Sequence, residues 1–338
     1  MGRVPARSAA ALVAALIAAS CSHAATAPAA GPAPASTTTL PVPTRARYPV
    51  AYRSETLMDA SRPTPANGSA PAKPTRTLST IVYYPTDGAL GSEPAAEAPA
   101  RRGPWPLVVF AHGLDGFGSA YQGLLMGWAS AGYVVAAPTF PLSSLTAPGG
   151  ATIADVVNQP ADVSFVLGQL LREGAASSGP LSGAVDPRRV AVAGHSLGAI
   201  TVLGLLNSCC HDPRIDAAII LAGLELSFGS GQRFFPPGEA PIPVLFEQGT
   251  RDRLIGYRYD HQAYAAAPSP KYFVTLEGAD HIGPYLDMSS AAGRVVLATT
   301  TDFLDQYVTR APAAEHGLVQ DGTVSGVAHV ESSITPSR

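Results

Sequence analysis

The serine in the segment GHSLG, residues 194–198, is the first residue whose surroundings could do chemistry. The segment fits the pattern Gly-x-Ser-x-Gly, follows the apolar run 190–193 and opens a second apolar run that ends at residue 206. A serine between a buried strand and a helix stands on a sharp turn, with its hydroxyl exposed at the edge of a sheet. The pattern therefore predicts Ser196 as a nucleophile rather than as a serine that only caps a helix.

A serine hydroxyl needs a neighbouring base, and that base needs a third group to orient it. His281 comes shortly after the apolar run 272–276, so we expect it at the carboxyl end of a strand, close to Ser196. The other downstream histidines lie at the far end of the helix after Ser196, in the C-terminal segment, or after no strand. His281 is therefore the predicted general base.

Two carboxylates compete to orient His281. Asp252 comes soon after the apolar run 244–246, and Glu225 follows the preceding run, 217–221. Some hydrolases take their acid from the earlier of these two loops. We favour Asp252, because its short side chain needs a backbone close to the histidine, which a tight Gly-Thr turn can provide.

Acyl transfer also needs two N–H groups that stabilise the negative oxygen of a tetrahedral intermediate. The residue after the nucleophile, Leu197, is one predicted donor. The loop HGLDG, residues 112–116, follows another apolar run and predicts Leu114 as the second donor. Phe117 and Tyr121 come next and are predicted to line an acyl or alcohol pocket, although packing in the core explains two aromatic residues equally well.

Seven apolar runs are expected to form the strands that position these residues: 78–84, 107–111, 133–137, 190–193, 217–221, 244–246 and 272–276. Helices are expected at 121–131, 161–172, 197–206 and 291–307. Strands that alternate with helices predict an α/β fold, with a doubly wound, mainly parallel sheet and helices on both faces. Active sites of such sheets lie beyond the carboxyl ends of the strands.

The composition favours a globular protein and argues against several other classes. The 338 residues are 46% hydrophobic, which is enough to bury a core, and carry a formal net charge of −3. Because acidic and basic residues nearly balance, we expect no nucleic-acid partner. Outside the extreme N-terminus no apolar run is long enough to cross a bilayer. The three cysteines have no zinc-site spacing, and we expect no metal and no cofactor.

The two ends of the chain differ from its middle. Residues 1–24 are predicted to be a secretory signal peptide, because two arginines precede an apolar stretch that is too short for a membrane span. Residues 25–46, rich in Pro and Ala, are predicted to be a disordered linker. The catalytic domain is expected at 47–310. Residues 311–338 lack sustained periodicity and are expected to form a loose tail.

Two processing routes fit the N-terminal signal. The segment SHA, residues 22–24, is a cleavage site for ordinary signal peptidase. The segment AASC, residues 18–21, resembles a bacterial lipobox, in which Cys21 is lipidated and tethers the protein to a membrane. We therefore expect a protein that is either secreted or lipid-anchored to the bacterial cell envelope. The sequence gives no indication of its oligomeric state.

These motifs together resemble the α/β-hydrolase superfamily. The resemblance is greatest to the group that holds secreted bacterial polyester hydrolases and cutinases, chlorophyllases, dienelactone-hydrolase-like proteins and platelet-activating-factor acetylhydrolases. It covers most of residues 48–308 and rests on HGLDG at 112–116, GYVVAAP at 132–138, GHSLG at 194–198, GTRD at 249–252 and GADH at 278–281. It implies the α/β-hydrolase fold and a triad of Ser196, Asp252 and His281.

The chain departs from some of these relatives. Polyester hydrolases usually carry an aromatic residue where this chain has Leu114, and a tryptophan near residues 222–225, which read AGLE here. Acetylhydrolase-like relatives take their acid from that second loop, so Glu225 stays an alternative to Asp252.

We expect a secreted serine hydrolase that cleaves small-molecule or polymeric carboxylic esters through an acyl-enzyme. The alternatives are a lipase-like or cutinase-like polyester hydrolase, an acetylhydrolase-like phospholipid esterase, and a non-catalytic binding protein on the same scaffold. A peptidase or an acyltransferase also stays open, because a triad does not select the acyl acceptor.

Overall fold

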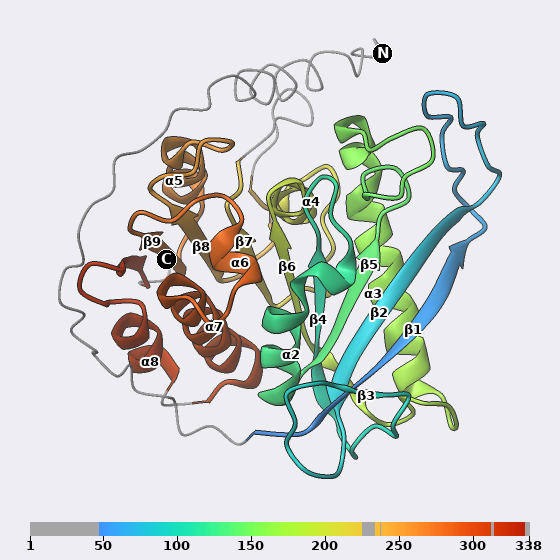
Figure 1. The fold of residues 1–338 in the computed structure, drawn as a ribbon, viewed down its shortest axis with the longest axis horizontal. Coiled ribbons are helices and arrows are strands. Elements are labelled where there is room, and N and C mark those ends of the chain that lie inside the picture. Colours follow the sequence, from blue (N-terminus) through green and yellow to red (C-terminus); the bar gives the residue numbers. More distant parts are fainter. Residues whose placement is uncertain (1–46, 225–233, 237, 312–313, 335–338) are drawn as a thin grey trace, which may run out of the picture.

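A mixed β-sheet runs through the computed structural model, which describes residues 47–224, 234–236, 238–311 and 314–334 (Figure 1). The predicted signal peptide, the predicted linker and Glu225 lie outside the described residues. The strands are β1 (Val50–Asp59), β2 (Arg76–Pro85), β3 (Ala95–Ala96), β4 (Trp105–Ala111), β5 (Val134–Thr139), β6 (Val185–His195), β7 (Ala217–Leu221), β8 (Val244–Gly249), β9 (Lys271–Leu276) and β10 (Ala328–Ser333).

Within the described residues the sheet has the order β10-β9-β8-β7-β6-β4-β5-β2-β1-β3. The strands from β9 through β5 pair in parallel. Antiparallel pairs add β2 and β1 at one end and β10 at the other. The carboxyl ends of the parallel strands therefore share one edge, which is where the expected site residues follow their strands.

The helices are α2 (Gln122–Ser130), α3 (Gln159–Ala175), α4 (Leu197–Leu206), α5 (Tyr257–Ala266), α6 (Gly283–Leu286), α7 (Ala291–Leu304) and α8 (Ala314–Asp321). Two short 3₁₀ helices, η1 (Gly118–Tyr121) and η2 (Ile153–Asn158), and one π-helical turn, η3 (Asp305–Thr309), complete the described elements. The predicted helix 291–307 thus ends as an α-helix at Leu304 and continues as η3.

Strand β4 shows how the sheet is covered on both faces. Its residues alternate between two hydrophobic clusters, with Leu107 and Val109 in one and Val108 and Phe110 in the other. Helices α3, α4 and α5 contribute to the first cluster, and helices α2, α7 and α8 to the second. Because both faces are buried, the strand reads as a continuous apolar run. The predicted doubly wound, mainly parallel sheet with helices on both faces is confirmed.

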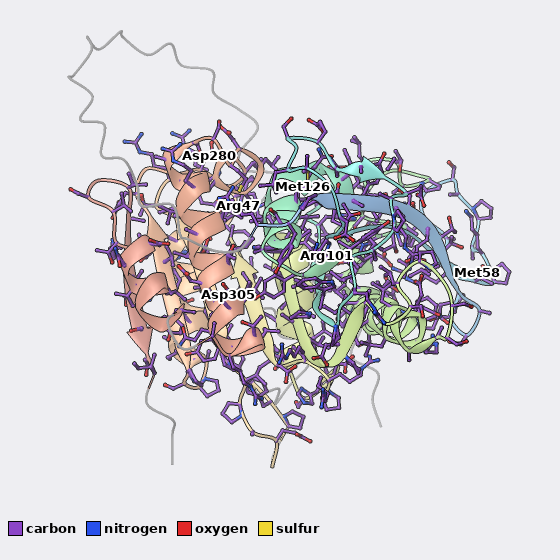
Figure 2. The ribbon with its side chains drawn as sticks, turned by 90° about the horizontal axis from the view of Figure 1, so that it is seen from below. Arg47, Met58, Arg101, Met126, Asp280 and Asp305 are labelled. Atoms are coloured by element: carbon purple, nitrogen blue, oxygen red, sulfur yellow. The ribbon has the colours of Figure 1, made fainter. Side chains whose placement is uncertain are left out.

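The hairpin of β1 and β2 forms the end of the molecule opposite to β9 and α8 (Figure 1). Figure 2 shows Met58, near the end of β1, at the far side of the molecule from Asp280. Strand β1 was not expected from its sequence, VAYRSETLMD, because polar and charged residues occupy many of its positions. Its ten residues pair in register with β2, so the hairpin partner stabilises a strand whose outer side chains are largely exposed.

The expectation of a loose tail at residues 311–338 is wrong for its described part. Helix α8 packs on α7 through the buried Leu318, and β10 pairs antiparallel with β9 from Ala328 to Ser333. Only Ala328 of β10 is fully buried, so the edge strand carries little hydrophobic signal of its own. The folded domain therefore extends beyond residue 310. No helix in the described ranges combines the length and the hydropathy that a membrane crossing requires.

Candidate active site

The turn between β6 and α4 holds Ser196 in a strained conformation. Its φ is +57°, and its amide donates a hydrogen bond to the carbonyl of Leu221 at the end of β7. A Cβ on Gly194 would lie 2.2 Å from the carbonyl oxygen of Gly198. A Cβ on Gly198 would lie 2.0 Å from the carbonyl oxygen of Ala111, so both glycines are required for this close approach. The strain is the kind that concentrates at functional sites.

Three side chains from separate loops meet at the carboxyl edge of the sheet. The Nε2 atom of His281 lies 2.8 Å from Oγ of Ser196. The Nδ1 atom of the same ring lies 2.6 Å from Oδ2 of Asp252. The structure thus brings together the predicted nucleophile, base and acid in one hydrogen-bonded line, whereas the rival acid Glu225 lies outside the described residues.

The carboxylate of Asp252 is fixed by several donors besides His281. Its Oδ1 accepts from the amides of Leu254 and Ile255, at 2.8 and 2.9 Å, and its Oδ2 accepts from the side-chain amide of Gln248 at 2.9 Å. These bonds hold the carboxylate group against the imidazole. Asp280, although adjacent to His281 in sequence, instead accepts bonds from amides of its own loop.

The two predicted oxyanion donors, Leu114 and Leu197, both line the pocket that contains Ser196. Leu197 is the first residue of α4, so its N–H has no partner within the helix. Leu114 follows β4 in a loop fixed by the buried His112, whose Nε2 accepts from the amide of Phe140 and whose Nδ1 donates to the carbonyl of Gly113. Burial lowers the pKa of His112 to about 4, so this brace stays neutral at physiological pH. Within the described residues, neither the N–H of Leu114 nor that of Leu197 donates a backbone hydrogen bond.

An apolar pocket of about 400 Å³ opens directly above Ser196. Phe117 lies at its rim and is 38% exposed, while Tyr121 is buried and contributes to the wall. Apart from these and the triad loops, the wall is formed mainly by aliphatic side chains: Leu114, Ile153, Leu197, Ile200, Leu224, Leu254, Ile255, Ile282 and Leu286. The pocket can hold an apolar group of a substrate next to the serine.

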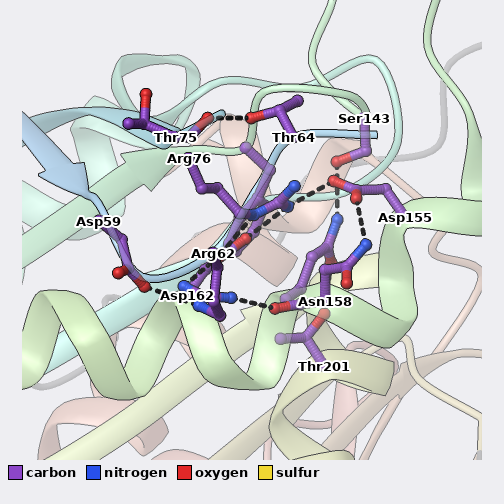
Figure 3. A network of polar contacts seen from close by, with 12 residues as sticks. Asp59, Arg62, Thr64, Thr75, Arg76, Ser143, Asp155, Asn158, Asp162 and Thr201 are labelled. Carbon is purple, nitrogen blue, oxygen red and sulfur yellow. Dashed lines mark hydrogen bonds and ion pairs between the residues drawn. The ribbon is translucent and has the colours of Figure 1, made fainter. Parts of the chain in front are cut away.

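A buried ion-pair network supports the wall that η2 contributes to the pocket (Figure 3). Arg76 of β2 bonds to Asp162 of α3 through two atoms and to Asp155 of η2, each at 2.6 Å. Burial disfavours the charged form of Arg76, but the bonds and charges of the two carboxylates outweigh it and raise its pKa. Asp155 stands between Ile153, which lines the pocket, and Val156, which packs on the same apolar cluster.

Sequence reasoning missed two residues that contact the predicted triad. Gln248 bonds to Asp252, and His195 bonds through Nε2 to the backbone carbonyl of His281 at 2.7 Å. His195 was treated only as the variable residue of Gly-x-Ser-x-Gly. Its polarity beside a buried strand was the one signal available. The described residues contain no group of three or more His, Cys, Asp or Glu side chains that could hold a metal ion.

Comparison with solved structures shows the fold of this chain in another protein. A ferulic acid esterase from Streptomyces cinnamoneus superposes with a TM-score of 0.61 and 21% sequence identity, covering 81% of this chain and 94% of that one. Together with the sheet order and the strand–serine–helix turn, this match shows that the chain has the α/β-hydrolase fold.

Comparisons at the sequence level cover a shorter segment. The family model described as Chlorophyllase matches residues 93–221. The uncharacterized protein YfhR of Salmonella typhimurium is 30% identical over 125 residues, which are 30% of this chain and 43% of that protein. YfhR of Escherichia coli O157:H7 is 23% identical over 120 residues, 30% of this chain and 42% of that protein. The matched segments thus span less than half of these curated relatives.

Proposed function

We propose that the protein is a serine hydrolase that cleaves carboxylic esters. The observation that carries the proposal is the line of contacts from Ser196 Oγ to His281 Nε2 and from His281 Nδ1 to Asp252, at 2.8 and 2.6 Å, at the floor of an apolar pocket. The esterase found among solved structures and the chlorophyllase model support a hydrolase of this class.

In the proposed reaction Ser196 Oγ attacks the ester carbonyl carbon while His281 Nε2 takes the hydroxyl proton. Asp252 holds the imidazole in the tautomer with Nδ1–H and stabilises the imidazolium. The amides of Leu114 and Leu197 donate to the oxyanion. The C–O bond of the ester then breaks, His281 returns the proton to the leaving alcohol, and water hydrolyses the acyl-enzyme by the same steps.

The pocket favours an uncharged ester with an apolar acyl or alcohol group. Its wall includes no Lys or Arg within the described residues, so a substrate carboxylate would lose its hydration without gaining a counter-ion. Among the described residues that line the pocket, the acidic residue outside the triad is Asp115, which is exposed. Aliphatic walls of this kind bind apolar groups through burial.

A second candidate is a lipase-like or cutinase-like hydrolase that acts on long or polymeric esters. It is favoured by three exposed apolar side chains at the pocket rim, Phe117, Ile282 and Leu286, which are 38, 49 and 41% exposed. Such a rim could contact a polymer or lipid surface. An acetylhydrolase-like phospholipid esterase would use the same rim.

The decisive experiment compares the wild type with Ser196→Ala. A fluorophosphonate should label the wild type stoichiometrically and leave the variant unlabelled, and ester turnover should fall on the order of 10⁶-fold. A non-catalytic binding protein would show neither labelling nor turnover. If the folded variant kept more than about a thousandth of the wild-type kcat, Ser196 would not be the nucleophile. A series of p-nitrophenyl esters of increasing acyl length, run beside a polyester film, separates the two ester classes.

We also propose that the chain is exported, on the basis of its N-terminal 24 residues alone. If Cys21 is lipidated, the native mature protein should partition into detergent, and Cys21→Ser should make it soluble. A native mature N-terminus at Ala25 would instead establish ordinary secretion and rule out the lipid anchor.

A further inference from the structure

A continuous chain of hydrogen bonds connects three loops around Ser196, and it includes no side chain of the triad. The hydroxyl of Tyr121 lies 2.8 Å from Nδ1 of His195 and accepts from the amide of Gly113 at 3.3 Å. Nε2 of His195 lies 2.7 Å from the carbonyl oxygen of His281. The chain therefore runs from the loop after β4, through the residue before the nucleophile, to the backbone of the residue that accepts the nucleophile's proton.

Chemistry determines the direction of every bond in this chain. A carbonyl oxygen can only accept, so Nε2 of His195 carries a hydrogen and donates it to His281. In a neutral imidazole Nδ1 is then bare and accepts, which makes the Tyr121 hydroxyl its donor. A lone pair of the same hydroxyl accepts from the Gly113 amide. Both ring nitrogens and the hydroxyl hydrogen thus have a partner.

The rings of the chain are also held by packing. The centroid of the His195 ring lies 4.9 Å from that of His281 and 4.8 Å from that of Tyr285. The ring of Tyr121 lies 4.6 Å from Phe110 of β4. A Cβ on Gly113 would lie 3.3 Å from Nδ1 of His195, so the loop after β4 rests directly on this ring.

Neither side chain changes its protonation state near neutral pH. Burial, together with the neighbouring His281, lowers the pKa of His195 to about 3. Burial raises the pKa of Tyr121 to about 12. Groups that stay neutral throughout the working range of an esterase are suited to hold other groups in place rather than to transfer protons.

We propose that His195 and Tyr121 are positioning residues, which hold the backbone of His281 and the Gly113–Leu114 loop at fixed positions relative to Ser196. This rests on the proposed esterase function. The loops that carry Ser196, His281 and Leu114 follow different strands. These loops set the distance between His281 and Ser196 and the direction of the Leu114 N–H. A shift of about 1 Å in such a site can reduce the rate about 10²-fold.

Two substitutions at His195 each retain one of its two hydrogen bonds, so they test the bonds separately. His195→Gln retains an amide N–H at the place of Nε2 and can still donate to the His281 carbonyl. His195→Asn retains an acceptor at the place of Nδ1 for Tyr121 but cannot reach His281. We expect His195→Leu to lower kcat about 10²-fold and His195→Asn to lower it nearly as much. His195→Gln should lower kcat only about 10-fold relative to the wild type. KM should stay within about 3-fold of the wild type.

Tyr121→Phe tests the other end of the chain and keeps the ring that packs on Phe110. We expect kcat to fall about 10-fold with the midpoint of the pH profile of kcat/KM unchanged. The matched control is Tyr133→Phe, which also removes the hydroxyl of a buried tyrosine. Tyr133 directly precedes β5, at its amino end, and its hydroxyl bonds to Asp305 of η3. The control should keep its kcat. Equal losses in both variants, a loss confined to KM, or a shifted pH midpoint would overturn a positioning role.

A measurement that needs no substrate distinguishes a failure of this inference from a failure of the proposed function. In ¹H–¹⁵N spectra of the wild type, His195 should appear as the neutral tautomer with Nε2–H from about pH 5 to pH 9, given its low pKa. A charged ring or the Nδ1–H tautomer would contradict the proposal even in an active esterase. Conversely, absence of labelling and turnover in the wild type would overturn the esterase function and with it the proposed role, whatever tautomer is found.

Discussion

The carboxylate of Asp252 shows how much of the site depends on a single side chain. It is fully buried, it bonds to His281, and it accepts from two amides of its own loop. A neutral amide in its place would keep the size of the group but would present N–H where the imidazole now finds an acceptor. The histidine would then favour the tautomer in which Nε2 carries the hydrogen and cannot take a proton from Ser196.

At the residue scale we predict that Asp252→Asn lowers kcat by roughly 10³- to 10⁴-fold, because the imidazole loses the partner that sets its tautomer. Glu225→Gln should cost less than about 10-fold. Both variants are measured on one soluble ester, and their melting temperatures control for folding. If Glu225→Gln lost most of its kcat while Asp252→Asn kept it, the acid would come from the loop after β7.

Elements of this protein are joined by buried polar groups of two different kinds. Asp162 of α3 is fully buried and ion-paired with Arg76 of β2 (Figure 3). Glu247 of β8 is fully buried too, but its Oε1 accepts only from the hydroxyl of Thr299 of α7, and its Oε2 is unsatisfied, within the described residues. Burial raises the pKa of Glu247 well above its ordinary value, which the Thr299 bond only partly offsets.

At the element scale we predict opposite outcomes for two changes that each convert a buried carboxyl to an amide. Asp162→Asn should lower the free energy of unfolding by roughly 3–5 kcal/mol, because Arg76 loses its bidentate partner. Glu247→Gln should change it by less than about 1 kcal/mol or increase it at pH 7, since folding no longer has to protonate a buried carboxyl. Urea unfolding measures both. A strongly destabilised Glu247→Gln would mean that the carboxylate is charged and paired in the fold.

The pH dependence of stability belongs to the whole molecule, because several buried groups titrate differently in the folded and unfolded chain. The pKa of His112 is lowered to about 4 and that of His195 to about 3, mainly by burial. Burial also raises the pKa of Glu247 and of Asp260, and these carboxyls act in the opposite direction as the pH falls. The effect of the histidines is therefore best measured as a difference between variant and wild type.

At the scale of the whole molecule we predict that the two histidines destabilise the fold in acid. Below about pH 6.5 the unfolded chain binds protons on these rings that the folded chain excludes, so stability falls as the pH decreases. When the pH is lowered from 6.5 to 4.5, the unfolding free energy of the wild type should fall by about 2–3 kcal/mol more than that of His112→Asn or of His195→Gln. Urea unfolding at several pH values provides the test. A difference independent of pH would show that the rings bind protons equally well in the folded and unfolded chain.

The amino-acid sequence by itself was enough to determine the features that depend on neighbours along the chain. The parallel strands read as apolar runs because both faces of the sheet are covered, and β7 and α4 have the predicted limits. The glycines around Ser196 predicted its turn, since only glycine allows the backbone to approach so closely there. The loops that carry Asp252 and His281 could be assigned to one edge of the sheet, because parallel strands end together.

Features that depend on partners far away in the sequence could be seen only once the chain was folded. Strand β10 has a mostly polar sequence and exists because the edge of β9 offers it hydrogen bonds. His195 reaches Tyr121 across 74 positions and His281 across 86, and no local pattern encodes such a contact. The ion pairs of Arg76 likewise join residues about 80 positions apart. Their physical reason is shared: a buried polar group must find a partner, and folding alone brings that partner within reach.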